Sequence, residues 1–121
     1  RDFVHVSDIV QANILAMENP AMDNRAFNVG SGSPVSVLEL ARSIARVLGS
    51  DVEPRVTGQF RAGDIRHCFG DCSAIKAMGF RPGVTLEQGV AGLARWAGDE
   101  AAHDMVDSAW KELRDHGLVT G

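Results

Sequence analysis

Two arginines and one aspartate are the side chains of this sequence with the most distinctive chemistry. Arg61 opens an Arg-Ala-Gly-Asp stretch at residues 61–64, and Arg1 stands at the front of the chain. A guanidinium is a planar, permanently charged fork that pairs with two phosphate oxygens, and a carboxylate such as Asp64 accepts hydrogen bonds from a sugar diol. Together they predict a site for a diphosphate flanked by ribose, the common part of nucleotide-sugars.

The same residues have a plainer interpretation. Arg61 and Asp64 could simply pair with each other across a turn, and surface ion pairs of this kind contribute little to stability. A loop position favours a functional role, because loops carry function more often than cores do. The residue types by themselves leave both interpretations open.

The composition is that of one compact globular domain. The chain has 121 residues, of which 45% are hydrophobic and 23% are charged. It contains no run of about 18 apolar residues, so we expect no membrane span. It also contains no basic segment followed by an apolar stretch, so we expect no secretory signal and a cytoplasmic location.

Charge divides the chain into two parts. Residues 1–98 carry ten acidic and ten basic side chains, whereas residues 99–121 carry six acidic and two basic ones and so account for the net charge of −4. Binding to nucleic acid would favour a basic face. We therefore expect a near-neutral body that binds no nucleic acid, followed by an acidic, amphipathic C-terminal helix and tail.

Apolar spacing predicts helices that alternate with short strands. Helices are expected at about 8–19, 36–48, 73–78, 85–97 and 102–115. Extended segments are expected at about 3–6, 26–29, 52–56 and 65–69. This order of strands and helices is typical of the α/β class. The last two helices are expected to anchor their tryptophans, Trp96 and Trp110, in the core.

The final helix should pack back onto the body, because its apolar stripe is about as wide as that of a normal core-facing helix. The inward side chains would be Ala102, Met105, Val106, Ala109, Trp110 and Leu113.

Two helix starts carry the spacing of a capping box, in which a hydroxyl and a carboxylate or amide satisfy each other's backbone. The pairs are Ser36 with Glu39 and Thr85 with Gln88. Gly49 is expected to end the helix that Ser36 begins.

Other polar residues have structural interpretations. Asp8 and Asp71 precede predicted helices and are interpreted as N-caps. Cys68 and Cys72, with His67 beside them, could bind a metal ion, but their C-x3-C spacing differs from the usual knuckle and no second pair completes four ligands. Two reduced, partly buried thiols are the better interpretation, and no metal site is expected.

The segment from Gly30 to Gly32, between a predicted strand and a helix, is similar to a dinucleotide-binding turn. The third glycine of that motif is missing, and no acidic residue ends a next strand about 20 residues further on. We interpret the segment as a turn that needs positive φ, and we place no cofactor-binding residue in it.

Assembled in order, these segments resemble the C-terminal part of the NAD-dependent epimerase/dehydratase family, the extended short-chain dehydrogenases that include UDP-glucose 4-epimerase-like enzymes. The matching blocks are residues 1–8, 27–32, 36–40, 61–66, 70–73 and 86–90, with Trp96 after them. Each block is weak alone, but their order and spacing are specific. The resemblance covers residues 1 to about 97. It implies the substrate-binding portion of an extended Rossmann-type enzyme, with short strands and four to five helices.

The resemblance implies a role for four residues. Arg1 and Arg61 match the arginines that grip the substrate diphosphate, and Asp64 matches the acid that holds the nucleotide ribose. Val37 matches an apolar contact to the base. The implied ligand is a UDP- or dTDP-sugar, and no catalytic residue is implied within this chain.

The resemblance also implies parts that this sequence does not contain. Family members bind NAD through an N-terminal glycine-rich turn and use a Tyr-x-x-x-Lys pair, whose tyrosine moves a proton on the sugar hydroxyl while hydride passes to the nicotinamide. The chain has no tyrosine. We therefore expect it to be inactive alone and to belong to a larger enzyme that inverts C4 of the sugar through a 4-keto intermediate.

Several alternatives remain open. The parent could be a nucleotide-sugar 4,6-dehydratase, or a deoxysugar 4-epimerase of the dTDP-rhamnose type, which the tail resembles. The chain could instead be a nucleotide-binding module without chemistry, or an element whose last helix recruits a partner. The family usually dimerises through the N-terminal half, so we expect a homodimeric parent, and strands left unpaired at exposed edges of this part.

Overall fold

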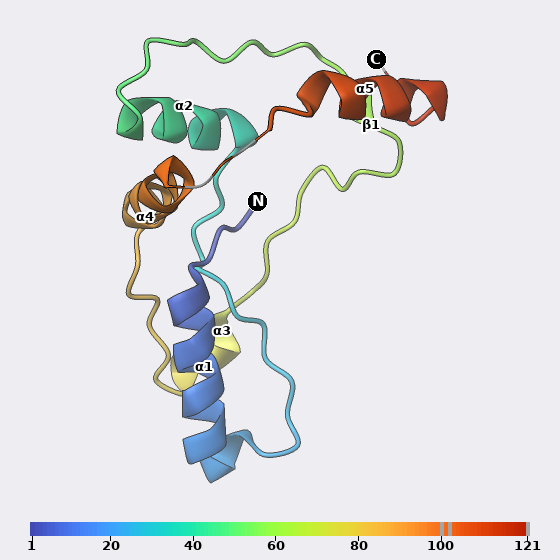
Figure 1. Cartoon of the computed structure of the whole chain (residues 1–121). Helices are drawn as coiled ribbons and strands as arrows, with labels where there is room; N and C mark the ends of the chain where they lie inside the picture. The colour runs from blue at the N-terminus through green and yellow to red at the C-terminus, as the bar shows by residue number, and fades with distance from the viewer. Residues whose placement is uncertain (100, 102, 121) are drawn as a thin grey trace.

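The computed structural model describes residues 1–99, 101 and 103–120 (Figure 1). Its elements, in chain order, are helix α1 (Val6–Glu18), the 3-10 helix η1 (Pro20–Met22), α2 (Val37–Val47), strand β1 (Phe60–Arg61), α3 (Ser73–Ala77), α4 (Leu86–Gly98), α5 (Val106–Asp115) and strand β2 (Val119–Thr120). Helices therefore form near the places that apolar spacing predicts, except that the last one begins several residues later.

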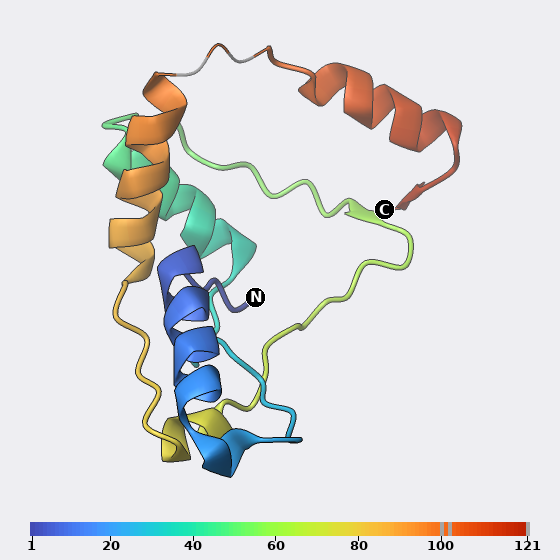
Figure 2. The ribbon, with the colours of Figure 1, turned by 60° about the horizontal axis from the view of Figure 1, so that its bottom comes forward.

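The helices fall into three groups. α2 packs against α4, and α3 lies beside the end of α1 that η1 follows (Figures 1 and 2). α5 stands apart from the other helices, and the paired strands β1 and β2 connect its end to the rest of the chain (Figure 2). None of the described helices is both long and apolar enough to cross a membrane.

The core is small and lies where α1, η1 and α3 meet. Its buried cluster consists of Ala12, Met22, Cys72, Ile75 and Phe80, and partly buried neighbours include Leu15, Phe27 and Met78. Elsewhere large apolar side chains remain exposed; Leu93 and Trp96 on α4 are each 60% exposed. The expectation that Trp96 anchors a core is therefore wrong for this chain.

Both predicted capping boxes are confirmed. The Ser36 hydroxyl accepts from the Glu39 amide at 3.1 Å, and the Glu39 carboxylate accepts from the Ser36 amide at 2.7 Å. Thr85 and Gln88 make the same reciprocal pair at 3.2 and 2.9 Å. Gly49 follows the end of α2 with a φ of +63°, so it ends that helix as predicted.

Asp8 does not cap its own helix, which corrects the prediction. The N-cap of α1 is His5, whose Nδ1 accepts from the Ser7 amide at 3.2 Å. Asp8 is instead buried in the first turn, and its carboxylate accepts from the amides of Gly83 at 2.9 Å and Val84 at 3.3 Å. The side chain is used to satisfy two amides of a distant loop, so it joins α1 to the segment that leads into α4.

Asp71 caps α3 from one residue further out than a normal N-cap. The N-cap residue is Cys72, and the Asp71 carboxylate accepts from the Ser73 amide at 2.8 Å. The backbone and side-chain hydrogen bonds from Ser73 lower the pKa of Asp71.

None of the four expected strands is present among the described residues. The two short strands that do form lie at Phe60–Arg61 and Val119–Thr120, paired antiparallel. At the front of the chain, Arg1 and Val35 exchange two hydrogen bonds, from the Arg1 amino group at 2.8 Å and the Val35 amide at 2.7 Å, as an antiparallel pair does. Arg1 and Val35 lie just outside the expected segments, so this short pairing forms none of the four predicted strands.

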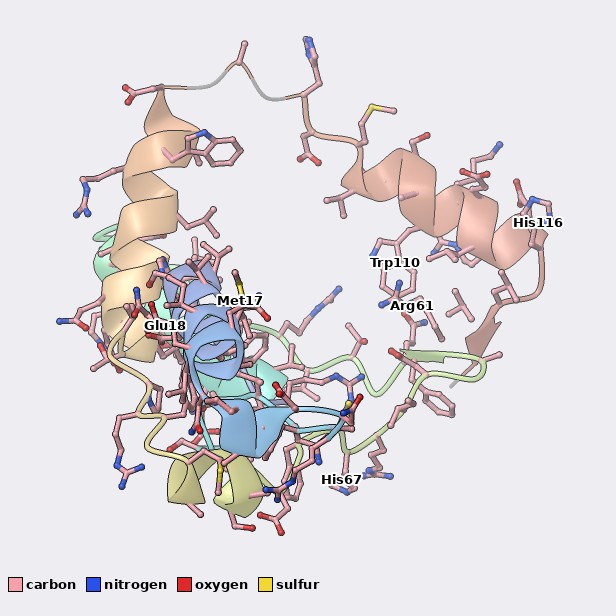
Figure 3. All side chains as sticks on the ribbon, turned by 90° about the horizontal axis from the view of Figure 1, so that it is seen from below. Met17, Glu18, Arg61, His67, Trp110 and His116 are labelled. Atoms are coloured by element: carbon pink, nitrogen blue, oxygen red, sulfur yellow. The ribbon has the colours of Figure 1, made fainter. Side chains whose placement is uncertain are left out.

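The expected packing of the final helix onto the body is also wrong. α5 begins at Val106, and Ala102 lies outside the described residues. Met105 and Val106 are 62% and 58% exposed, and no side chain of α5 is fully buried. Trp110 is half-buried and projects on the side of α5 that faces Arg61 (Figure 3). The tail is held by strand pairing in place of helix packing.

Candidate functional site

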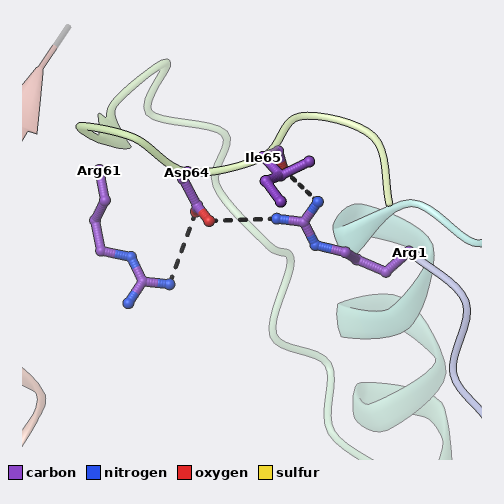
Figure 4. Close-up of polar contacts among 4 residues, drawn as sticks. All are labelled: Arg1, Arg61, Asp64 and Ile65. Carbon is purple, nitrogen blue, oxygen red and sulfur yellow. Dashed lines mark hydrogen bonds and ion pairs between the residues drawn. The ribbon is translucent and has the colours of Figure 1, made fainter. Parts of the chain in front are cut away.

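Arg1, Arg61 and Asp64, which the sequence nominates as ligand-binding residues, meet in the structure. Nη2 of Arg1 lies 3.4 Å from Oδ1 of Asp64, and Nη2 of Arg61 lies 3.8 Å from Oδ2 of the same carboxylate. The two guanidiniums therefore approach one carboxylate from opposite sides (Figure 4). A small anion at this point would lie within reach of both cations.

Arg1 is fixed at both of its ends. Its backbone pairs with Val35, just before α2, as described above. Its guanidinium also donates from Nη1 to the backbone carbonyl of Ile65. Sequence reasoning missed Ile65, because a backbone carbonyl leaves no signal in the choice of side chain. Arg1 thus connects the start of α2 to the loop that carries Asp64.

Arg61 is placed by strand β1 and by the turn that follows it. Its partner across the ladder is Val119 of β2, and the Ala62 amide donates to the Leu118 carbonyl at 2.9 Å. The Asp64 amide then donates to the Arg61 carbonyl at 3.1 Å, which closes a turn. Gly63 sits in this turn with a φ of +78°, a conformation that few other residues adopt.

The ion pairs of the site are exposed and easily exchanged. The side chains of Arg1, Asp64 and Arg61 are 30%, 43% and 61% exposed. Exposed pairs of this kind contribute roughly 0 to 1 kcal/mol each. The cluster carries two positive charges and one negative charge, so it has a net positive charge. A more highly charged anion could replace Asp64 as the partner of the guanidiniums at little cost.

Val37, the fourth nominated residue, is the first residue of α2 and is 67% exposed. It stands two residues beyond Val35, the backbone partner of Arg1. Figure 4 accordingly draws α2 next to Arg1. An apolar side chain so exposed contributes little to the core, which leaves it available to a ligand.

Two surface hollows lie elsewhere. One of about 320 Å³ is lined by residues that include Asp2, Cys72 and Lys76. The other, of about 410 Å³, is lined by residues that include Phe3 and Thr85. Neither is lined by Arg1, Arg61 or Asp64, whose partly exposed side chains converge at the surface of the protein.

Asp2 occupies the turn that is similar to a dinucleotide-binding motif. Its carboxylate accepts from the amides of Ser31 at 3.0 Å and Gly32 at 3.1 Å, and also from the Ser31 hydroxyl. Partial burial raises the pKa of Asp2, but the hydrogen bonds from Ser31 and Gly32 outweigh it and lower the pKa overall. Amides that could hold a phosphate are therefore already used, which supports the interpretation of this segment as a structural turn.

The cysteines form no cluster. Cys72 is buried and Cys68 is exposed, and both are free thiols, so the expectation that both are partly buried is wrong for Cys68. Among the described residues, no group of three or more His, Cys, Asp or Glu side chains could hold a metal ion.

The chain is similar in sequence to known sugar 4-epimerases. No protein-family model matches the chain. It is 37% identical over 101 residues to a dTDP-L-rhamnose 4-epimerase of Burkholderia thailandensis, covering 83% of this chain and 28% of that protein. It is 33% identical over 99 residues to a UDP-glucose 4-epimerase of Bacillus subtilis, covering 79% and 29%.

A solved structure of a 4-epimerase is also similar to this chain. The crystal structure of UDP-glucose 4-epimerase with UDP-glucose from Thermotoga maritima matches with a TM-score of 0.65 and 38% identity, covering 75% of this chain and 29% of that one. The chain thus spans less than a third of the length of the relatives it matches. Sequence and structure agree that the chain belongs to the NAD-dependent epimerase/dehydratase family and is a homologue of its nucleotide-sugar 4-epimerases.

Proposed function

We propose that this chain is the C-terminal, substrate-binding part of an NAD-dependent nucleotide-sugar 4-epimerase. Arg1 and Arg61 grip the nucleotide diphosphate, Asp64 holds the ribose, and Val37 contacts the base. The N-terminal part of the enzyme, outside this sequence, supplies NAD, the catalytic Tyr-x-x-x-Lys pair and the surface through which a cytoplasmic homodimer forms.

The observation that carries the proposal is the convergence of two guanidiniums on Asp64. A diphosphate offers oxygens to both forks and bears more negative charge than one carboxylate, so it can displace Asp64 from the arginines. The freed carboxylate is then adjacent to the diphosphate, where the ribose of a nucleotide follows. Its oxygens can accept hydrogen bonds from ribose hydroxyls.

The relatives support the ligand class. One acts on dTDP-L-rhamnose and another on UDP-glucose, and the solved relative was crystallised with UDP-glucose. These compounds differ in base and sugar but share a diphosphate and a pentose. The shared part is what Arg1, Arg61 and Asp64 are suited to bind.

NAD, which would accept and return the C4 hydride, is assigned to the part of the enzyme that precedes this chain. The turn of this chain that is similar to a dinucleotide-binding motif has its Ser31 and Gly32 amides taken by Asp2. The sequence also contains no tyrosine that could serve the sugar hydroxyl. Alone, the 121-residue chain is expected to give no product with NAD and a nucleotide-sugar.

The proposal is tested by binding in the full-length enzyme. Arg61→Ala should weaken the affinity for UDP and for dTDP about tenfold to a hundredfold, because a charge-assisted hydrogen bond contributes roughly 1.5–3 kcal/mol. Arg61→Lys keeps the charge but loses the fork, so its affinity should be intermediate. Titration calorimetry provides the dissociation constants.

Arg55→Ala is the matched control, because Arg55 is also exposed and lies six residues earlier in the same loop. It should leave both dissociation constants within about twofold, which corresponds to the small effects of exposed charges. If Arg61→Ala leaves the affinity for both nucleotides unchanged, the proposal is refuted.

The similarity to the Burkholderia enzyme favours one second candidate, a deoxysugar 4-epimerase of the dTDP-rhamnose type. The same titrations distinguish it. Binding of dTDP that is clearly tighter than that of UDP would favour the deoxysugar enzyme. A full-length protein that binds nucleotides but lacks turnover would instead be a binding module, and one that forms a 4-keto-6-deoxy product would be a dehydratase.

A further inference from the structure

The C-terminal segment of residues 106–120 reaches the strand that carries Arg61. β2 pairs antiparallel with β1, in a register that sets Val119 opposite Arg61 and Thr120 opposite Phe60. The ladder is extended by the bond from the Ala62 amide to the Leu118 carbonyl at 2.9 Å. Residues directly opposite each other in an antiparallel pair project on the same face, so Val119 flanks the base of the Arg61 side chain.

The turn at the end of α5 directs the chain toward β1. Gly117 follows the helix with a φ of +67°. Its amide donates to the Arg114 carbonyl and the Leu118 amide donates to the Leu113 carbonyl, both at 2.9 Å, which is the pattern of a Schellman motif. This turn brings Leu118 directly into the ladder between β1 and β2. Figure 2 shows α5 turning back through β2 onto the strand of the long loop.

This pairing matters because the loop has few other supports. Between α2 and α3, β1 is the only regular element of the described chain, and every residue from 55 to 71 is exposed. Fixing the backbone of each residue costs about 1–2 kcal/mol of conformational entropy. The contacts that hold the Arg61 end of this loop include the β1–β2 ladder, and the hydrogen bonds from the Arg1 guanidinium to Asp64 and to the Ile65 carbonyl.

We infer that residues 106–120 are a positioning element for Arg61 and thereby set the affinity of the enzyme for the nucleotide diphosphate. The inference rests on the proposed function, in which Arg61 grips that diphosphate. The ladder fixes where the Arg61 backbone lies, and Trp110 lies on the side of α5 that faces it (Figure 3). Without the ladder, binding must first order the loop, so affinity falls.

The first test is truncation of the full-length enzyme after Gly117, which removes β2 and leaves α5. The dissociation constants for UDP and dTDP should rise about fivefold to tenfold. In an Arg61→Ala background the same truncation should change neither constant, because the residue that the ladder positions is gone. A general loss of structure would weaken binding equally in both backgrounds, and that result would overturn the inference.

A point variant covers the case in which the truncated protein does not fold. Gly117→Ala places a Cβ at positive φ and should disturb the turn into β2. Gly49→Ala is its matched control: Gly49 has a φ of +63°, ends α2 with the same pair of hydrogen bonds, and like Gly117 has open space where the alanine methyl group would lie. Only Gly117→Ala should weaken UDP binding, although both should lower the melting temperature similarly.

The outcomes separate this inference from the proposed function. If Arg61→Ala itself leaves UDP and dTDP affinity unchanged, the proposed function fails and the inference fails with it. If Arg61→Ala weakens binding but truncation and Gly117→Ala do not, the proposed function stands and the positioning role is refuted.

Discussion

Arg1 and Asp64 are 63 positions apart in the chain, yet a guanidinium nitrogen of the first lies 3.4 Å from a carboxylate oxygen of the second. The contact joins the N-terminal segment, which pairs with Val35 just before α2, to the loop after β1, and Arg61 approaches the other oxygen of the same carboxylate. Asp64 thus holds the two cations together, and in the proposed function it competes with the substrate diphosphate for them.

Asp64→Ala should therefore have opposite effects on two ligands. Removing the carboxylate frees both arginines, so inorganic pyrophosphate should bind about fivefold more tightly, as expected for one charge interaction of about 1 kcal/mol near water. UDP should gain less or lose affinity, because it loses the acceptor of its ribose hydroxyls. The measurement is the ratio of the two dissociation constants in the full-length enzyme, by calorimetry.

Asp51→Ala is the control for this experiment, since it removes the same charge from an exposed position in the same long loop. It should shift both ligands slightly and equally. A parallel gain for pyrophosphate and UDP in Asp64→Ala would mean that Asp64 acts only through its charge, and its assignment to the ribose would be wrong.

Asp8 should be a major determinant of stability. Asp8→Leu leaves the amides of Gly83 and Val84 without their buried acceptor, which should lower the free energy of unfolding by about 2–4 kcal/mol. Asp8→Asn keeps one acceptor oxygen and should lose about half as much. Urea denaturation measures both, with the exposed Asp23→Asn as a control near zero. A loss below about 0.5 kcal/mol in Asp8→Leu would contradict this role.

The helices could be predicted from sequence because their signals are local. Ser36 and Glu39 satisfy each other within one turn, and Thr85 and Gln88 do the same, so four residues contain the whole interaction. Asp8 shows the limit of this reasoning. Its position fits an N-cap, but the amides that donate to it lie 75 and 76 residues away in the sequence. Rules based on local residue spacing do not predict such distant contacts.

The strand predictions are wrong for a related reason. A strand is stabilised by its neighbour, and the segments at 3–6 and 26–29 find no strand partner in the described chain. The pairing that does form, between β1 and β2, joins residues 58 or more positions apart whose types carry no signal of it. For the site, residue chemistry nominated Arg1, Arg61 and Asp64 as one group, and the structure shows that both arginines meet the Asp64 carboxylate.

The hydrogen bonds to Asp2 predict how stability changes in acid. Its pKa lies below the ordinary value of 3.8 in the folded protein, because bonds from Ser31 and Gly32 outweigh the effect of burial. A carboxyl whose folded pKa is lowered contributes stability that is fully present above the unfolded pKa and is lost as pH falls through the folded one. Asp2→Asn should therefore be less stable by about 1–2 kcal/mol at pH 7.

The difference between Asp2→Asn and the unaltered chain should shrink below pH 4 and vanish in stronger acid, as measured by urea denaturation across that range. Glu39 and Asp71, whose pKa values are also lowered by hydrogen bonds at their helix starts, are common to both proteins and cancel in the comparison. A difference that stays constant from pH 7 into strong acid would show that the Asn side chain destabilises the turn because it fits poorly there. The charge of Asp2 would then contribute nothing to the stability of the turn.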